Sequence, residues 1–136
     1  MDIEAFQALP TKEVARLVCL EGAQVCVFPI NGTRRWFLLE HPPQPGADWL
    51  PHYMDVAARN HVDLYRLFFD HGLDTLLTPI FGPDLLERGD DYLDIFAGGL
   101  ARLATHPVFV DFYDAYQVRV RFYGDHRRFF AATPYA

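Results

Sequence analysis

Three short apolar segments, separated by longer stretches with helical periodicity, constrain the fold more than any other feature of this sequence. Residues 24–30, 75–81 and 118–123 are rich in the β-branched, aliphatic and aromatic residues typical of strands, and the first two predict buried strands. Strands that alternate with helices form parallel sheets with right-handed crossovers. The sequence therefore predicts an α/β fold with an incomplete, Rossmann-like three-layer arrangement, in a single domain over residues 1–136.

The stretches between the predicted strands carry apolar stripes at helical spacing. A first helix begins at Thr11 and ends at Gly22. The clearest helix ends at Gly72, and its stripe consists of Met54, Ala58, Val62, Tyr65 and Phe69. A third has its apolar face over residues 92–103, and a fourth begins at Pro107. The proline-rich residues 42–46 predict a loop.

A glycine corner followed by charged residues comes after each predicted strand. The corners are Asn31-Gly32, Gly82-Pro83 and Gly124-Asp125, and the charged residues include Arg34, Arg35, Arg88, Arg127 and Arg128. Parallel strands end at one edge of a sheet, where backbone N–H groups and guanidinium groups can bind an anion the size of a diphosphate. Glycine and charge are also common in any exposed loop, so periodicity alone leaves both interpretations open.

Composition excludes several classes of function. The sequence has no serine, and Lys12 is its only lysine, which removes serine nucleophiles, the Gly-Lys-Ser/Thr phosphate loop and nearly all Schiff-base chemistry. A formal charge of −6 argues against a nucleic-acid partner. No apolar run approaches the roughly 20 residues of a membrane-spanning helix. The acidic start "MDIEAFQALP" is unlike a signal peptide, and a soluble, cytoplasmic protein is expected.

Metal-binding and tail-binding residues are harder to assign. The spacing of the histidines predicts no histidine metal site. Asp90 or Asp91 could bind Mg²⁺, but acidic residues in the first turn of a helix are also expected from its dipole. The aromatic residues over 109–116 fit a core, and the same residue types would form a wall for an isoprenoid tail. Cys19 and Cys26 match no metal or redox spacing and predict two buried thiols.

Three motifs together resemble the cis-prenyltransferases, the undecaprenyl diphosphate synthase family. "VCVFPINGTRRW" is similar to the first family signature, in which an apolar strand runs into Asp-Gly-Asn-Gly-Arg-Trp. "LLTPIFGPDLLER" is similar to the second, with Phe-Ser-x-Glu-Asn-Trp-x-Arg, and "VRVRFYGD" to the third, with Val-Arg-Val-Arg-x-Ile-Gly-Asp. The order agrees, so the resemblance covers about residues 23 to 128, the N-terminal part of such a domain.

The resemblance implies site residues at matching positions. The residues implied to bind a substrate diphosphate are Asn31, Gly32, Arg34, Arg35 and Arg88, and those implied to line the substrate pocket are Trp36, Phe81 and Gly82. It also implies Mg²⁺. The family's catalytic aspartate is replaced here by Pro29-Ile30, so neither a catalytic residue nor a metal ligand is assigned.

The function implied is the processing of an isoprenoid diphosphate, by a prenyltransferase or a terpene (diterpene) synthase-like enzyme, with the allylic diphosphate bound at the C-terminal ends of the strands. The alternative is a non-catalytic binding or partner subunit, which the missing aspartate favours. The third predicted strand would leave an open sheet edge. That edge predicts a homo-oligomer, a second subunit or a longer polypeptide.

Overall fold

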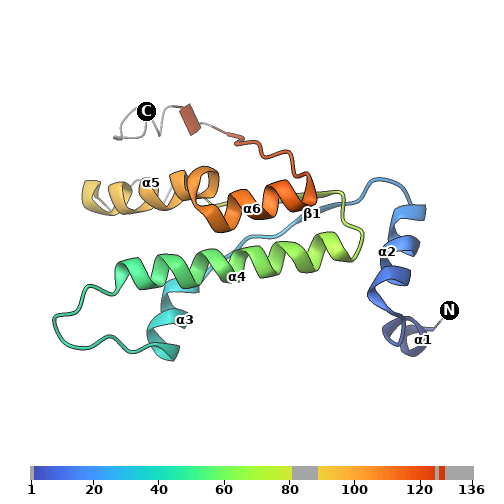
Figure 1. Ribbon diagram of the computed structural model, residues 1–136, viewed down its shortest axis with the longest axis horizontal. Helices are drawn as coiled ribbons and strands as arrows, with labels where there is room; N and C mark the ends of the chain where they lie inside the picture. Colours follow the sequence, from blue (N-terminus) through green and yellow to red (C-terminus); the bar gives the residue numbers. More distant parts are fainter. Residues whose placement is uncertain (1, 81–88, 125, 128–136) are drawn as a thin grey trace. The chain divides into compact units, whose positions relative to one another are not determined.

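The computed structural model describes residues 2–80, 89–124 and 126–127, with residues 90–95 described by their backbone alone. These residues belong to two compact units, Met1–Ile80 and Phe81–Ala136, and each is described by itself. Figure 1 labels the helices and the first strand. The single domain expected over residues 1–136 remains a prediction.

The first unit contains four helices and two strands among its described residues. They are α1 (Ile3–Gln7), α2 (Thr11–Leu20), β1 (Val25–Val27), α3 (Thr33–Glu40), α4 (Leu50–Asp70) and β2 (Thr75–Leu77). The predicted helix from Thr11 and the predicted long helix ending before Gly72 are both confirmed, as α2 and α4. The loop at residues 42–46 is confirmed as well. Helix α3 was not predicted.

Strands β1 and β2 form a parallel pair, as the sequence predicts. Val25 pairs with Thr75, and Val27 with Leu77. One further bond extends the ladder, from the Phe28 N–H to the Leu77 carbonyl oxygen at 2.9 Å. Continuing the same register would bring Pro29 opposite Pro79, and proline has no N–H for a ladder. The prolines therefore explain why the strands are shorter than the predicted segments 24–30 and 75–81.

The prediction that β1 and β2 are buried strands was wrong, because no residue of either strand is buried. The side chains of Val25 and Val27 are each 59% exposed. The apolar core of the first unit lies instead on α4, where Ala58, Val62 and Tyr65 are buried, in agreement with the predicted stripe. Short apolar runs indicate a strand but do not reveal how many of its faces are covered.

The C-terminal end of α4 packs closely against α2. Gly72, just after α4, has a φ of +89°, and a Cβ added there would lie 2.7 Å from the Ala15 carbonyl oxygen. The Cys19 thiol contacts the Gly72 carbonyl oxygen at 3.8 Å. Cys19 is nevertheless exposed and Cys26 is half-buried, so the predicted burial of both thiols was wrong. Glycine at position 72 permits both the left-handed backbone and the close approach of the two helices.

The second unit contains α5 (Asp90–Thr105) and α6 (Pro107–Tyr116), which pack against each other (Figure 1). Both helices were predicted. At the start of α6, Nδ1 of His106 accepts a hydrogen bond from the Val108 N–H at 3.3 Å. Phe109 and Phe112 are 3% and 1% exposed, so these two aromatic residues belong to a core. No helix among the described residues has the length and apolarity to cross a membrane.

The predicted third strand, residues 118–123, was wrong. Helix α6 ends at Gln117 in the left-handed conformation, with a φ of +53°, and the Val118 N–H bonds back to the Tyr113 carbonyl oxygen at 2.8 Å. Over the described residues the sheet has two strands, β1 and β2. The structure thus fits a mixed α/β fold and does not confirm a Rossmann-like sheet. Without a third strand, the argument from an open sheet edge no longer supports the predicted homo-oligomer, second subunit or longer polypeptide.

The stability of this fold is expected to rise with pH, in part because of His61. Nδ1 of His61 lies 2.6 Å from the Ala57 carbonyl oxygen, and burial lowers the pKa of the imidazole although this hydrogen bond opposes the shift. The unfolded chain takes up the proton near pH 6.5, while the folded chain takes it up at a lower pH. His61 therefore contributes stability above about pH 6.5 that is lost as the pH falls.

Urea denaturation from about pH 5 to about pH 7.5 measures this contribution. The unfolding free energy of the wild-type chain should increase over this range more than that of His61→Gln. Parallel curves for the two proteins would show that His61 titrates alike in the folded and unfolded states.

Candidate anion-binding site at the start of helix α3

The chain that leaves β1 turns at Asn31-Gly32 and enters α3. Gly32 caps the helix in the left-handed region, with a φ of +77°. A Cβ at Gly32 would meet no atom within 4 Å, so the backbone conformation, not lack of space, favours glycine there. The Gly32 N–H donates to Oδ1 of Asn31 at 2.7 Å. Asn31 thus holds the turn from within.

This hydrogen bond changes the roles expected of Asn31 and Gly32. The Gly32 N–H was expected to contact a phosphate, but it already has the Asn31 oxygen as its acceptor. The first hydrogen bond along α3 runs from the Trp36 N–H to the Gly32 carbonyl oxygen at 3.0 Å. The N–H groups of residues 33–35 precede it and form the positive end of the helix. They replace the Gly32 N–H as the candidate backbone donors.

Arg34 and Arg35 lie in this first turn and are exposed. The turn contains no acidic residue. Cations at a helix N-terminus are unfavourable because they face the positive end of the dipole. The start of α3 therefore concentrates positive charge that a bound anion would offset.

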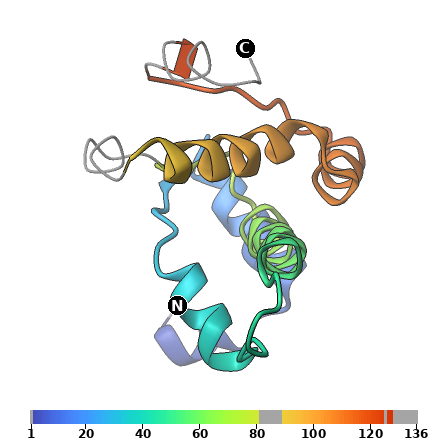
Figure 2. The same cartoon turned by 90° about the vertical axis from the view of Figure 1, so that its left-hand side faces the viewer.

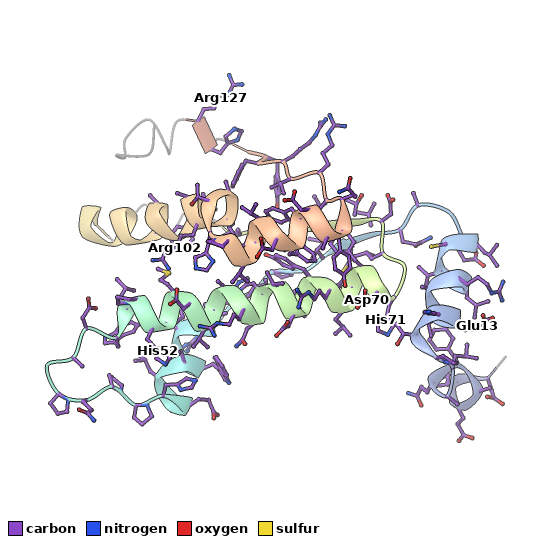
Figure 3. All side chains as sticks on the ribbon, in the orientation of Figure 1. Glu13, His52, Asp70, His71, Arg102 and Arg127 are labelled. Atoms are coloured by element: carbon purple, nitrogen blue, oxygen red, sulfur yellow. The ribbon has the colours of Figure 1, made fainter. Side chains whose placement is uncertain are left out.

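An aromatic cluster around Phe37 holds α3 against the beginning of α4. Phe37 is 1% exposed. Its ring centroid lies 4.9 to 6.3 Å from those of four residues, which are His41, Trp49, His52 and Tyr53. Figure 2 views α4 nearly along its axis, with α3 beside it, and Figure 3 labels His52 on the α4 side of this cluster. Burial of Phe37 thus fixes α3 to α4, the helix that carries most of the described core of the first unit.

A polar contact joins the same two helices at the first residue of α3. Oγ1 of Thr33 lies 2.9 Å from the Tyr53 hydroxyl, and the pair is partly buried. Neither residue was among the predicted site residues. Thr33 stands between the Asn-Gly and Arg-Trp pairs that match the family motif, and Tyr53 lies beside the predicted apolar stripe of α4. Periodicity gives no signal for a hydrogen bond between residues 20 positions apart.

The remaining predicted residues divide into two groups. Trp36 is 43% exposed, and its indole meets the His41 ring edge-on with centroids 6.1 Å apart. Phe81, Gly82 and Arg88 lie outside the described residues. The structure therefore brings Asn31, Gly32, Arg34, Arg35 and Trp36 together through one turn, and its described residues do not test the contribution of the second motif. Within the described part of the chain, no three side chains of the metal-ligating types converge.

Comparison with known proteins gives one informative similarity. No family model matches the chain. It is 40% identical over 128 residues to tuberculosinyl adenosine transferase of Mycobacterium tuberculosis (strain CDC 1551 / Oshkosh). The aligned region covers 94% of this chain, so it includes β1, α3 and α4, but only 42% of that protein. The similarity supports a prenyltransferase relationship without establishing the cis-prenyltransferase family. It relates this chain to an enzyme that handles a prenyl-type group.

Proposed function

We propose that the start of α3 binds the diphosphate of an isoprenoid diphosphate, and that the chain takes part in transferring the prenyl group. Two findings support this proposal. The turn after β1 presents Arg34, Arg35 and the N–H groups of residues 33–35 together. The relative that aligns across this turn is named as a tuberculosinyl adenosine transferase. The observation that carries the proposal is the pair of arginines in the first turn of α3, at the positive end of the helix.

The chemistry would be the cleavage of the bond between the allylic carbon and the diphosphate. The bonding electrons leave with the diphosphate oxygen, and an acceptor then forms a bond to the allylic carbon. Guanidinium and backbone N–H groups stabilise the negative charge that develops on the leaving oxygen. We take adenosine, the acceptor in the name of the relative, as the first acceptor to test. A terpene synthase-like reaction would use the same diphosphate site.

A non-catalytic binding subunit is the second candidate. The segment "VCVFPINGTRRW" contains no carboxylate, and Asn31, at the turn, carries an amide that bonds to the Gly32 N–H. Such a site can bind an anion, but it offers no acid or base of its own. The chain spans 42% of the length of its relative, so the catalytic residues of a complete enzyme could come from other polypeptide. A homo-oligomer or second subunit remains a prediction.

Among the residues that the structure describes, Mg²⁺ has no evident protein ligand in this site. Carboxylate oxygens are the ligands that Mg²⁺ usually takes from proteins. The segment from β1 to Trp36 contributes none, and the described residues hold no cluster of three metal-ligating side chains. We assign no step to a metal. Titrations with and without Mg²⁺ will show whether the diphosphate binds to the protein as a complex with the ion.

Arg35→Ala should weaken binding of geranylgeranyl diphosphate by about 2 kcal/mol, or roughly thirtyfold, the usual contribution of a charge-assisted hydrogen bond. Arg35 is exposed, so its removal should barely change the melting temperature. Isothermal titration calorimetry measures the affinity and thermal denaturation the stability.

Arg16→Ala is the matched control for this experiment. It also removes an exposed arginine, but from α2, where Arg16 pairs with Glu13. It should leave the affinity unchanged. An equal loss of affinity in both variants would indicate general charge attraction in place of a site at α3, and a large fall in melting temperature for Arg35→Ala would make Arg35 a structural residue.

A further inference from the structure

We propose that Tyr53 is a positioning residue for the diphosphate site, acting through its hydrogen bond to Thr33. The inference rests on the function proposed above and assigns a role to a residue of α4 that has none in the sequence motifs. Tyr53 lies 20 positions from Thr33 in the chain, yet its hydroxyl lies 2.9 Å from Oγ1 of Thr33. Thr33 is the first residue of α3 and directly precedes the two arginines.

The position of this hydrogen bond lets it orient the first turn of α3 relative to α4. The first turn of α3 follows a glycine, whose backbone is less restricted than that of any other residue. The Phe37 ring anchors α3 one turn further along. Between Gly32 and Phe37, the Thr33 side chain is a point at which the first turn bonds to α4. Without the hydrogen bond, the turn with Arg34 and Arg35 would lose this link to α4.

The Tyr53 ring and its hydroxyl have separable roles. The ring centroid lies 5.4 Å from that of Phe37 and 6.0 Å from that of Trp49. Tyr53→Phe keeps these contacts and removes the hydroxyl alone. Thr33→Val likewise keeps the branched shape of threonine and removes the hydroxyl, whereas Thr33→Ser keeps the hydroxyl and removes a methyl group. These three variants distinguish the hydrogen bond from packing.

The test measures the affinity for geranylgeranyl diphosphate, and for inorganic pyrophosphate, by titration calorimetry. Tyr53→Phe and Thr33→Val should each weaken binding about fivefold, the effect of one ordinary hydrogen bond on the position of a binding group. The double variant should bind no more weakly than either single variant, because both remove the same bond. Thr33→Ser should bind within twofold of the wild type, since its hydroxyl can still reach Tyr53.

Tyr65→Phe is the control that distinguishes a positioning role of Tyr53 from a merely structural one. Tyr65 lies on the same helix, is 7% exposed, and bonds through its hydroxyl to the Thr78 side chain, after β2. Removing this hydroxyl should lower the melting temperature at least as much as Tyr53→Phe does and leave the affinity unchanged. Binding by Tyr53→Phe within twofold of the wild type, or equal losses of affinity in Tyr53→Phe and Tyr65→Phe, would overturn the positioning role. A wild-type chain that binds neither ligand would overturn the proposed function itself.

Discussion

Replacing Phe37 with alanine is expected to lower the free energy of unfolding by about 3–5 kcal/mol, the range for a fully buried phenylalanine. Phe37 is 1% exposed, and its ring packs against two histidines, a tryptophan and a tyrosine. The change would leave a cavity where α3 meets α4, in addition to the lost burial of the ring. Denaturation by urea, followed by circular dichroism, measures the loss.

Leu39→Ala provides the comparison on the same helix. Leu39 lies two residues further along α3 and is 82% exposed, so its replacement should change the free energy of unfolding by no more than about 0.5 kcal/mol. Equal effects of the two substitutions would contradict the packing of α3 through Phe37. They would also remove the basis for a fixed site at the start of that helix.

Gly72→Ala is expected to destabilise the chain by about 3 kcal/mol, since two costs act together. The first is the left-handed backbone at Gly72, whose φ of +89° strains any residue with a side chain. The second is steric. The new Cβ would lie 2.7 Å from the carbonyl oxygen and 2.9 Å from the Cα of Ala15, and backbone atoms of a packed helix cannot move aside easily. The midpoint of urea denaturation reports the combined loss.

Gly22→Ala separates these two costs. Gly22 has a similar φ of +94°, but a Cβ there would meet nothing within 4 Å. Its replacement should therefore cost only the backbone strain, about 1–2 kcal/mol. A Gly72→Ala variant no less stable than Gly22→Ala would show that α2 and α4 do not approach each other as closely as described.

The parts of the fold that the sequence predicted are those with a local physical signal. The stripe on α4, with Ala58, Val62 and Tyr65 buried, repeats at the period of a helix and was found for that reason. Parallel pairing of β1 and β2 follows from the helical sequence between them. In contrast, α3 buries only Phe37 among its described residues, so an eight-residue helix showed no stripe to detect.

The prediction of a strand at residues 118–123 failed although the local pattern of a strand is present. Its alternation of Val and Arg is the pattern of a strand, but a strand also needs a neighbour that supplies hydrogen bonds. Over the described residues the sheet stops at β1 and β2. Local sequence records the preference of a segment and carries no information on whether a partner strand is present.

The candidate site shows the same division between local and distant information. The Asn31-Gly32 corner and the arginines after it were visible in the sequence, because turn residues and charge are local. The internal hydrogen bond that occupies the Gly32 N–H, and the contact of Thr33 with Tyr53, depend on conformation and on packing between helices. The sequence therefore predicted the location of the turn. It did not predict which backbone N–H groups are available to an anion.

The position of the diphosphate can be tested residue by residue with amide ¹H–¹⁵N NMR spectra of the 136-residue chain during titration with geranylgeranyl diphosphate. If the start of α3 binds the diphosphate, the amide signals of Thr33, Arg34 and Arg35 should shift most, because their N–H groups precede the first hydrogen bond of the helix. The amide signals of α2 should remain unchanged. Saturation that leaves the signals of residues 33–35 in place, or shifts confined to other helices, would contradict a diphosphate site at this helix end.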